Sequence, residues 1–251
     1  RSQTDFFQRM PKCLREPLTG QKEIDGALPP KIPKTNAQRD TAGKRVIVFL
    51  DQASLETVKT TKGYELLSCD DHRHLHKKFK KNPADYRPDI CHQSLLALLD
   101  SPLNKAGLLQ IYLRTKKNVL IEIHPSLRIP RTIKRFNGLM VQLLHKLKIR
   151  AVNGPHVLMK VIKNPVLQHL PAGAKKVVTS CAGKLVNMHD YVKTLPQDQP
   201  VVFAFGQISH GTIEHDLEWA EECISFSQYP LSAACAIGRM LNAFENHWGI
   251  L

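Results

Sequence analysis

The clearest apolar period in the chain lies in residues 130–147. If Pro130 occupies the first helical position, where its missing N–H is not needed, a helix begins there and Arg131, Lys134 and Arg135 follow at spacings of three and four. The other side of this helix is apolar and comprises Ile133, Phe136, Leu139, Met140, Leu143, Leu144 and Leu147. The pattern predicts a core helix whose outer surface is basic.

Shorter apolar runs predict strands that alternate with helices. Strands are predicted at 44–51, 108–114, 118–124, 175–180 and 200–205, and helices at 53–59, 89–100, 188–195 and 230–248. Asp89 is expected to be the N-cap of the second helix, and Pro230 is expected at the first position of the last one. The run 154–164 is ambiguous between helix and strand. The alternation predicts an α/β fold, a mainly parallel sheet with helices on both faces.

The chain divides into a tail and one domain. Residues 1–43 mix charges with "ALPPKIPK" and have no sustained period, which predicts a disordered basic tail. Residues 44–251 are expected to form one domain, with a polar, proline-marked loop or insertion at about 70–88. There is no apolar run of 18 residues and no apolar block of a signal peptide near the start, so we expect a soluble protein that is not secreted.

Charge is divided unevenly along the sequence. The chain has 36 Lys and Arg against 22 Asp and Glu, a net charge of +14. Residues 108–150 hold ten basic residues and one acid, whereas residues 189–251 hold two basic residues and eight acids. The first region favours an anionic partner such as RNA or an acidic membrane. The second favours a small ligand that carries a positive charge over a nucleotide phosphate.

Metal-binding residues are present, but without a recognisable spacing. The six cysteines are scattered and include no CxxC pair, which favours reduced thiols over disulfides or zinc. The tract "DDHRHLHKKFKK" offers Asp70, Asp71, His72, His74 and His76, yet five Lys and Arg lie among and after them. Because these cations would repel a metal ion, we expect a solvated or RNA-facing loop and assign no metal.

Three segments at strand ends are candidate ligand loops. In "FGQISHGTI", Gly206 and Gly211 have phosphate-loop spacing, but Thr212 and Ile213 replace the Lys and Ser/Thr that such a loop requires. No GxGxxG follows a strand, and no GxSxG places a catalytic serine. The segment "VVTS" also ends a predicted strand, and "FSQYPLSAACA" opens the last predicted helix. These loops either satisfy turn geometry or line a ligand site at the carboxyl ends of parallel strands.

Four longer runs match a known family: "RPDICHQSLLALLDSPLNKAGLLQIYL", "KNVLIEIHPSLRIPRTIKRFNGLMVQLLHKL", "VIKNPVLQHLP" and "YPLSAA". They closely resemble the eukaryotic and archaeal ribosome-biogenesis pseudouridine N1-methyltransferases of the SPOUT superfamily. The resemblance covers about residues 44–251. It implies a trefoil knot near the carboxyl end, S-adenosyl-L-methionine as methyl donor bound in that knot, no metal, and a homodimer.

The resemblance also implies roles for single residues. Asp89 would hold Arg87 beside the reacting base. The RNA-binding residues would be Arg87, Arg128, Arg131 and Arg135. The cofactor-binding residues would be Thr179, Gly206, Gly211, Phe226, Ser227, Gln228, Tyr229, Pro230 and Leu231. The implied function is N1-methylation of a pseudouridine in a hairpin of small-subunit ribosomal RNA, with a part in small-subunit assembly alongside assembly factors, in the nucleus and nucleolus, with no membrane partner.

Other interpretations stay open. Gln228 stands where the family usually has asparagine, "GQISHG" replaces the commoner "GAxAHG", and residues 70–81 are more basic than is typical. Asp89 is a base, a brace or only a helix cap, and the arginines are an RNA grip or a solvated surface. The alternative function is a non-catalytic, rRNA-binding assembly factor. A peripheral membrane protein is less consistent, because no basic amphipathic helix with an exposed apolar face is evident.

Overall fold

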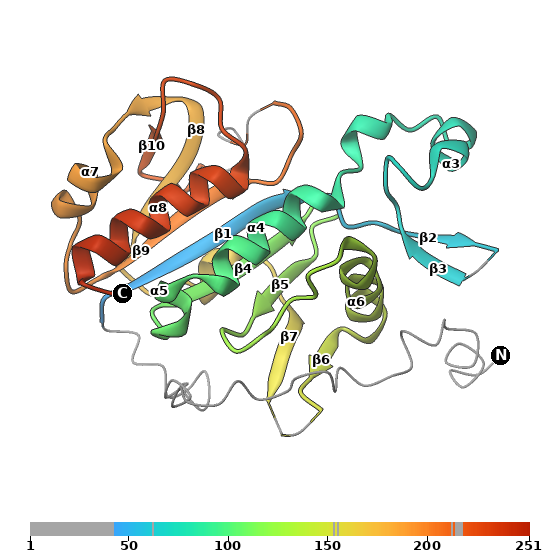
Figure 1. Ribbon diagram of the computed structural model, residues 1–251, viewed down its shortest axis with the longest axis horizontal. Helices are drawn as coiled ribbons and strands as arrows, with labels where there is room; N and C mark the ends of the chain where they lie inside the picture. Colours follow the sequence, from blue (N-terminus) through green and yellow to red (C-terminus); the bar gives the residue numbers. More distant parts are fainter. Residues whose placement is uncertain (1–42, 62, 153, 155, 212, 214–217) are drawn as a thin grey trace.

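A computed structural model describes residues 43–61, 63–152, 154, 156–211, 213 and 218–251 (Figure 1). The predicted tail therefore lies outside the described residues, apart from Gly43. An eight-stranded sheet has the order β10-β8-β9-β1-β4-β5-β7-β6. Its strands are β1 (Arg45–Ala53), β4 (Leu109–Thr115), β5 (Leu120–Ile123), β6 (Lys148–Arg150), β7 (Val157–Ile162), β8 (Lys175–Leu185), β9 (Pro200–Gly206) and β10 (Glu222–Ser225).

The sheet is mainly parallel, as predicted. Neighbouring strands are parallel from β10 to β4 and antiparallel from β4 to β6. The five predicted strands are present, and the ambiguous run 154–164 contains strand β7. The short strands β6 and β10 were not predicted. Each buried strand reads as a continuous apolar run because both of its faces are covered.

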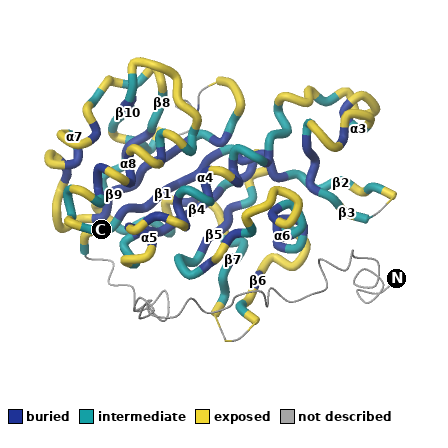
Figure 2. Tube along the Cα trace, in the orientation of Figure 1, coloured by how far each residue is buried: buried dark blue, intermediate teal, exposed yellow. Residues whose placement is uncertain are grey.

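The two faces of the sheet are covered differently. Five α-helices, α4 to α8, gather on one face of the sheet, where they bury Val46 and Val48 of β1 (Figures 1 and 2). The helices are α4 (Pro88–Asp100), α5 (Pro102–Lys105), α6 (Ile133–Lys146), α7 (Met188–Thr194) and α8 (Ala233–Trp248). The other face, with Ile47 and Phe49, is covered by loops and the 3-10 helix η3 (Val166–His169). The α/β fold with a mainly parallel sheet is thus as predicted, and among the described residues the helical cover of the second face is the short η3.

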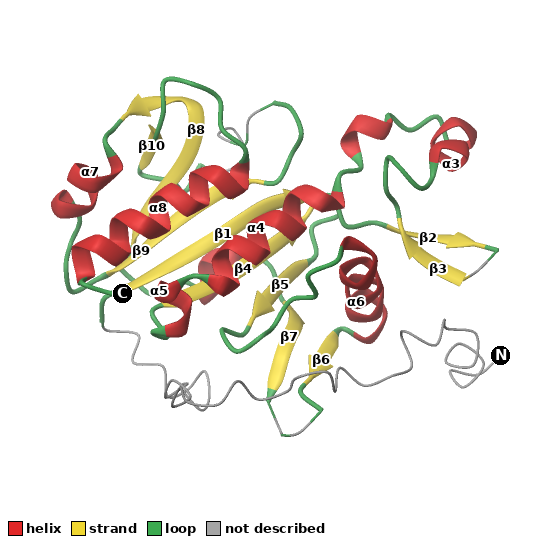
Figure 3. Ribbon diagram, viewed as in Figure 1, coloured by secondary structure: helices red, strands yellow, loops and turns green. Residues whose placement is uncertain are grey.

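Residues 54–86 leave the main sheet and form what we call the side lobe. It contains the antiparallel hairpin of β2 (Thr57–Thr60) and β3 (Gly63–Leu66), then α3 (Arg73–Lys78) and the 3-10 helix η2 (Pro83–Asp85) (Figure 3). The side lobe begins earlier than the loop or insertion predicted at about 70–88. The helix predicted at 53–59 is wrong, because its β-branched residues pair with β3 as a strand.

Helix α6 begins later than predicted. Thr132 is the N-cap and Pro130 lies outside the helix, where its carbonyl oxygen accepts a hydrogen bond from His92 Nε2 at 2.7 Å. The helix ends at Leu147, which adopts a left-handed conformation and is 53% exposed. The apolar stripe between these ends is buried at Phe136, Leu139, Met140 and Leu143. The core helix with a basic outer surface is confirmed, but the two ends of its stripe, Ile133 and Leu147, are not buried.

The starts of α4 and α8 also differ from the prediction. Arg87 occupies the N-cap of α4 and Asp89 is its second residue, so Asp89 is not the N-cap. Ser232 caps α8 by accepting a hydrogen bond from the backbone N–H of Cys235, which places Pro230 two residues before the cap. In the described part of the chain, no helix is long and apolar enough to cross a membrane.

Gly183 marks a close approach of two backbones. Strand β8 pairs with β10 at Val177 and Val178 and pairs again only at Lys184, after an irregular stretch. A Cβ atom on Gly183 would lie 2.7 Å from the backbone nitrogen of Ile224. Neither backbone can move aside without breaking the pairing of β8 with β10.

We therefore expect Gly183→Val to lower the free energy of unfolding by about 2–3 kcal/mol, as overpacking does. Gly238→Val is the matched control, because Gly238 lies on α8 with no atom within 4 Å of a built Cβ. Urea unfolding of both variants measures the effect. Equal midpoints would show that the close approach is not a constraint on folding.

Candidate active site

Three loops meet at one edge of the sheet. The first loop is residues 179–183 within β8, the second is 206–211 after β9, and the third is 226–231 after β10. Strands β10, β8 and β9 are parallel neighbours, so these carboxyl ends lie side by side. Open α/β sheets bind ligands at such an edge. The structure thus brings together the three segments that sequence analysis had singled out.

Specific contacts hold the first and third loops to β9. The Thr179 hydroxyl donates a hydrogen bond to the carbonyl oxygen of Ala204 at 2.9 Å. The ring of Phe226 is buried and lies edge-on to Phe205, with 6.2 Å between the ring centroids. Thr179 and Phe226 therefore fix their loops, and their side chains have structural partners already.

The rest of the third loop faces solvent. Tyr229 is 74% exposed, and Gln228, Pro230 and Leu231 are exposed as well. The backbone N–H of Tyr229 donates to the Ser227 hydroxyl at 3.0 Å, which keeps the loop in a tight turn. The residue that departs from the family pattern, Gln228, is thus an exposed side chain on this turn.

The second loop is anchored to the end of β1. Gln207 is buried, and its backbone N–H donates to the carbonyl oxygen of Asp51 at 2.8 Å. The fully buried Asp51 carboxylate accepts two hydrogen bonds from Arg114, at 2.6 and 2.8 Å. Sequence analysis missed this pair. The sequence feature that could have indicated this pair is a charged residue near the end of each of two apolar strands: Asp51 in "FLDQ" and Arg114 in "YLRT".

Arg87 and Asp89 form a two-point ion pair, as the family resemblance implies. Arg87 Nε donates to Asp89 Oδ1 at 2.8 Å, and Nη2 donates to Oδ2 at 2.6 Å. The hydrogen bonds from Arg87 hold the pKa of Asp89 below its usual value, although partial burial opposes this. The same hydrogen bonds raise the pKa of Arg87. Both groups are therefore charged at neutral pH, and Arg87 is held in one orientation.

The second loop and the Arg87–Asp89 pair are neighbours. The Ser209 hydroxyl donates to the carbonyl oxygen of Ala84 at 2.6 Å, and His210 Nε2 lies 3.6 Å from Asp85 Oδ1. Residues 84 and 85 precede Arg87 by three and two positions in the chain. These contacts join segments that are 125 residues apart in the sequence. They bring the loop edge of the sheet to the amino end of α4.

The remaining arginines lie beside α6. Arg128, Arg131 and Arg135 are all exposed. Arg131 Nη1 lies 2.7 Å from Asp100 Oδ2, so one of these three arginines has an acidic partner. An exposed pair of this kind contributes little stability, and Arg131 stays available to an anion.

Arg131 and Arg87 lie toward opposite ends of α4. Asp100 is the last residue of that helix, and Asp89 is its second. A rise of 1.5 Å per residue separates the two acids by roughly 17 Å along the helix axis. The candidate RNA-binding arginines therefore spread over a surface and do not form one cluster.

The acids of residues 189–251 favour a cationic ligand less than their number in the sequence indicates. Asp190 pairs with Lys193, and Glu221 and Glu222 pair with Lys175. Two further acids, at 214 and 216, lie outside the described residues. Three of the eight acids in residues 189–251 thus have basic partners in the described part of the chain.

The histidine tract does not converge on a common point. His72 Nε2 lies 2.9 Å from Glu65, and His76 Nε2 bonds the carbonyl oxygen of Ser68 at 3.1 Å, whereas His74 is exposed. Within the described ranges no three His, Cys, Asp or Glu side chains are grouped as metal ligands. The two buried histidines stabilise the side lobe.

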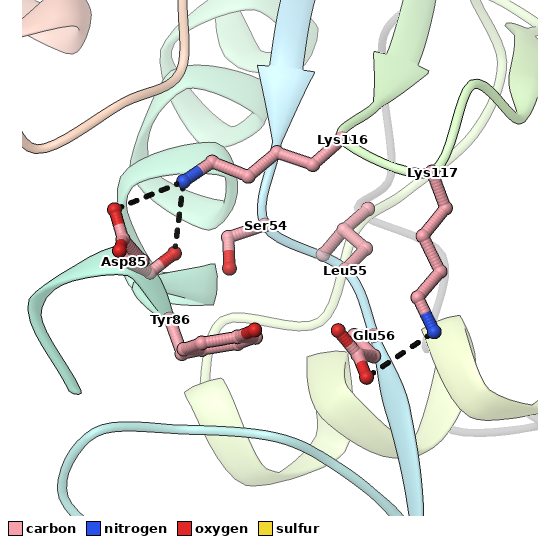
Figure 4. A pocket seen from close by; sticks show the side chains of 7 residues that line it. All are labelled: Ser54, Leu55, Glu56, Asp85, Tyr86, Lys116 and Lys117. Atoms are coloured by element: carbon pink, nitrogen blue, oxygen red, sulfur yellow. Dashed lines mark hydrogen bonds and ion pairs between the residues drawn. The ribbon is translucent and has the colours of Figure 1, made fainter. Parts of the chain in front are cut away.

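A cavity of about 290 Å³ lies between the side lobe and the turn that joins β4 to β5 (Figure 4). Two ion pairs border it, Lys116–Asp85 at 3.3 Å and Lys117–Glu56 at 3.2 Å. It is lined by Ser54, Leu55, Glu56, Asp85, Tyr86, Lys116 and Lys117. Because Tyr86 precedes Arg87, the cavity adjoins the ion pair at the start of α4.

Comparison with known proteins identifies proteins of similar fold and sequence. The fold matches the crystal structure of Archaeoglobus fulgidus Nep1 bound to S-adenosylhomocysteine, with a TM-score of 0.62, 23% identity, and coverage of 82% of this chain and 99% of that one. The fold is therefore that of a Nep1-type methyltransferase. The family model for the EMG1/NEP1 methyltransferase matches residues 48–245, and the chain belongs to this family.

Similar sequences carry a consistent name. The human ribosomal RNA small subunit methyltransferase NEP1 is 51% identical over 238 residues, which cover 94% of this chain and 96% of that protein. The Drosophila melanogaster protein of the same name is 51% identical over 214 residues, covering 83% and 84% respectively. The family that the sequence runs had indicated is thereby confirmed.

Proposed function

We propose that this protein transfers a methyl group from S-adenosyl-L-methionine to N1 of a pseudouridine in small-subunit ribosomal RNA. The observation that carries the proposal is the contact of Ser209 and His210 with residues 84–85. It links the loops that would hold the methyl donor to the ion pair that would face the base. The names of the NEP1 relatives and the S-adenosylhomocysteine bound to the Archaeoglobus protein support the same assignment.

The residues present fit a nucleoside ligand at the three loops. The first loop would contribute Thr179, the second Gly206 and Gly211, and the third residues 226–231. Gly211 has a φ of +88°, a conformation that favours glycine, and it lets the second loop turn tightly. The exposed Tyr229 and Leu231 offer apolar surface for the ligand or for a second subunit. S-adenosyl-L-methionine would supply an electrophilic methyl group there, and no metal is needed.

Arg87 and Asp89 would act on the base. N1 of pseudouridine must lose its proton to become nucleophilic, and a fixed guanidinium favours the negative charge that develops on the ring. The lowered pKa of Asp89 makes it a weak base, which supports a role in orienting Arg87. Much of the rate would then come from alignment of the reacting atoms.

The RNA partner would be a hairpin that contains the target pseudouridine. Arg128, Arg131 and Arg135 would contact its phosphates, since the three are exposed and lie beside one helix. Ribosome-assembly factors, a homodimer built on a knotted carboxyl-terminal region, and location in the nucleus and nucleolus complete the proposal. These features rest on the family resemblance.

Loss of a phosphate contact has a characteristic signature. We expect Arg128→Ala and Arg135→Ala each to weaken binding across RNA sequences and to lower the salt slope of binding by about 0.7–0.9 units. Arg131→Ala should lower it less, because Arg131 must leave Asp100 to bind phosphate. Fluorescence anisotropy of a labelled hairpin between low and moderate salt measures this. A slope that none of the three variants alters would identify the arginines as a solvated surface.

A second candidate function is a non-catalytic assembly factor that only binds rRNA. The exposed Gln228 and the altered second loop favour it, because both depart from the family pattern where the methyl donor would bind. Calorimetric titration with S-adenosyl-L-methionine separates the two functions, since a pure scaffold shows no heat of binding. Methyl transfer to a pseudouridine-containing hairpin, compared with the same hairpin containing uridine, then tests the proposed reaction.

A further inference from the structure

The side lobe displays an aromatic ring among cations. Lys77, Lys78, Phe79 and Lys80 are consecutive and all exposed, and Phe79 is 52% exposed. Lys78 Nζ lies 5.8 Å from the centroid of the Phe79 ring. Among the described residues, no acid forms an ion pair with these three lysines. We call residues 77–80 the lobe patch.

Packing of the lobe does not explain the lobe patch. The lobe is held together by the buried His72 and His76, and His76 contacts the Tyr86 ring with 5.1 Å between the centroids. The side chain of the next lysine, Lys81, turns inward instead. Its Nζ donates a hydrogen bond to Glu56 Oε1 at 2.5 Å. About half of the Phe79 side chain is therefore left uncovered by the lobe, and exposed lysines flank it on both sides.

We propose that the lobe patch is a second RNA-binding surface, which takes an unpaired strand flanking the hairpin. This rests on the proposed function only in that RNA is the substrate. One base would stack on Phe79, and Lys77, Lys78 and Lys80 would contact the neighbouring phosphates. Exposed aromatic rings between cations suit single strands, because the faces of bases are free there and are covered in a duplex.

The path from the lobe patch to the candidate active site is also basic. Lys81 lies at the end of the lobe patch, 5.0 Å from the centroid of the Tyr86 ring, and Tyr86 precedes Arg87. Lys116 and Lys117 border the cavity beside it, and Lys117 is 62% exposed (Figure 4). A strand that crosses the side lobe toward Arg87 would therefore pass Lys116 and Lys117, which also pair with Asp85 and Glu56.

The test compares two RNAs: a blunt hairpin, and the same hairpin with unpaired flanks on both sides. Phe79→Ala is expected to weaken binding of the flanked RNA at least about fivefold, the lower end of the effect of losing a stacked base, and to leave the blunt hairpin unchanged. Phe79→Trp should retain the affinity. The triple change of Lys77, Lys78 and Lys80 to Gln should lower the salt slope for the flanked RNA by about two units.

Matched controls separate this effect from general loss of charge or apolar surface. Leu167→Ala removes an exposed apolar side chain from η3 on the opposite face of the sheet, and Lys163→Gln removes an exposed cation nearby. Both should bind the two RNAs like the unchanged protein. Melting temperatures confirm that all variants are folded, since none of the substituted side chains is buried.

The proposal is overturned if Phe79→Ala binds both RNAs unchanged, or if it weakens both equally. It is also overturned if the variant loses binding to vesicles of anionic lipid and keeps its RNA affinity, because the lobe patch would then be a membrane contact. None of these measurements needs methyl transfer. If the protein methylates no RNA but still prefers flanked RNA, the proposed function is refuted. The proposal that the lobe patch binds RNA is then still supported.

Discussion

Replacing Gly206 with tryptophan is expected to weaken binding of S-adenosyl-L-methionine at least about a hundredfold, or about 2.7 kcal/mol, and to leave RNA affinity largely intact. Gly206 ends β9 and opens the second loop. A Cβ atom there would already lie 3.1 Å from the side chain of Ile213, so an indole requires displacement of the second loop, where the methyl donor is proposed to bind. Calorimetry with the methyl donor and anisotropy with the hairpin measure the two affinities separately.

Gly238→Trp serves as the control for this variant. Gly238 is exposed on α8 with open space around a built Cβ, so tryptophan there should alter neither affinity. Of the RNA-binding arginines of the proposal, Arg128, Arg131 and Arg135 lie just before or on α6, and only Arg87, the N-cap of α4, lies next to the second loop. A folded Gly206→Trp protein that loses both ligands equally would contradict this separation of the two sites.

The fold could be predicted where burial imposes a long, regular pattern. The buried strands β1, β4 and β9 read as apolar runs, and α4, α6 and α8 as apolar stripes, because each must face the core. The errors concern short or marginal segments. Strands β6 and β10 have three and four residues, too few to establish a period.

Helix starts were misplaced for a common reason. At both Pro130 and Pro230 the proline was taken as the first helical residue, yet Thr132 and Ser232 are the actual N-caps. The Ser232 hydroxyl can satisfy a free backbone N–H, whereas proline only tolerates the position. A hydroxyl residue two positions after a proline was the better signal in each case.

Individual site residues could be predicted more readily than their arrangement. Arg87 and Asp89 are two residues apart, and local geometry alone brings them together. Contacts between distant segments leave no local trace: Ser209 with Ala84, or Arg131 with Asp100. Charge counts were misleading for the same reason, because Glu222 is neutralised by Lys175, 47 residues away in the sequence.

Arg87→Ala is expected to lower the rate of methyl transfer about a hundredfold, as loss of one fixed donor to a developing anion does, with a smaller effect on RNA affinity. Asp89→Ala should have the same effect, because a freely rotating Arg87 no longer faces the base. The double variant should be little worse than either single variant, since the two residues act as one unit. Single-turnover transfer to a pseudouridine hairpin measures all three.

The pH dependence distinguishes a brace from a base. The pKa of Asp89 is lowered by Arg87, so the carboxylate and its stabilising pair persist above the unfolded pKa of about 3.9 and are lost only as the pH falls through the lower folded value. The transfer rate should therefore show no titration of Asp89 near neutral pH. A general base would instead give an acidic limb that disappears in Asp89→Asn.

Asp89→Ser gives the sharpest outcome. Serine can cap a helix or accept one hydrogen bond, but it cannot hold the guanidinium at two points as Asp89 does at 2.8 and 2.6 Å. We expect a protein of nearly unchanged melting temperature whose transfer rate matches that of Asp89→Ala, because Arg87 already occupies the N-cap of α4. Full activity in Asp89→Ser would reject the brace, since the fixed orientation of Arg87 would then be unnecessary for the reaction.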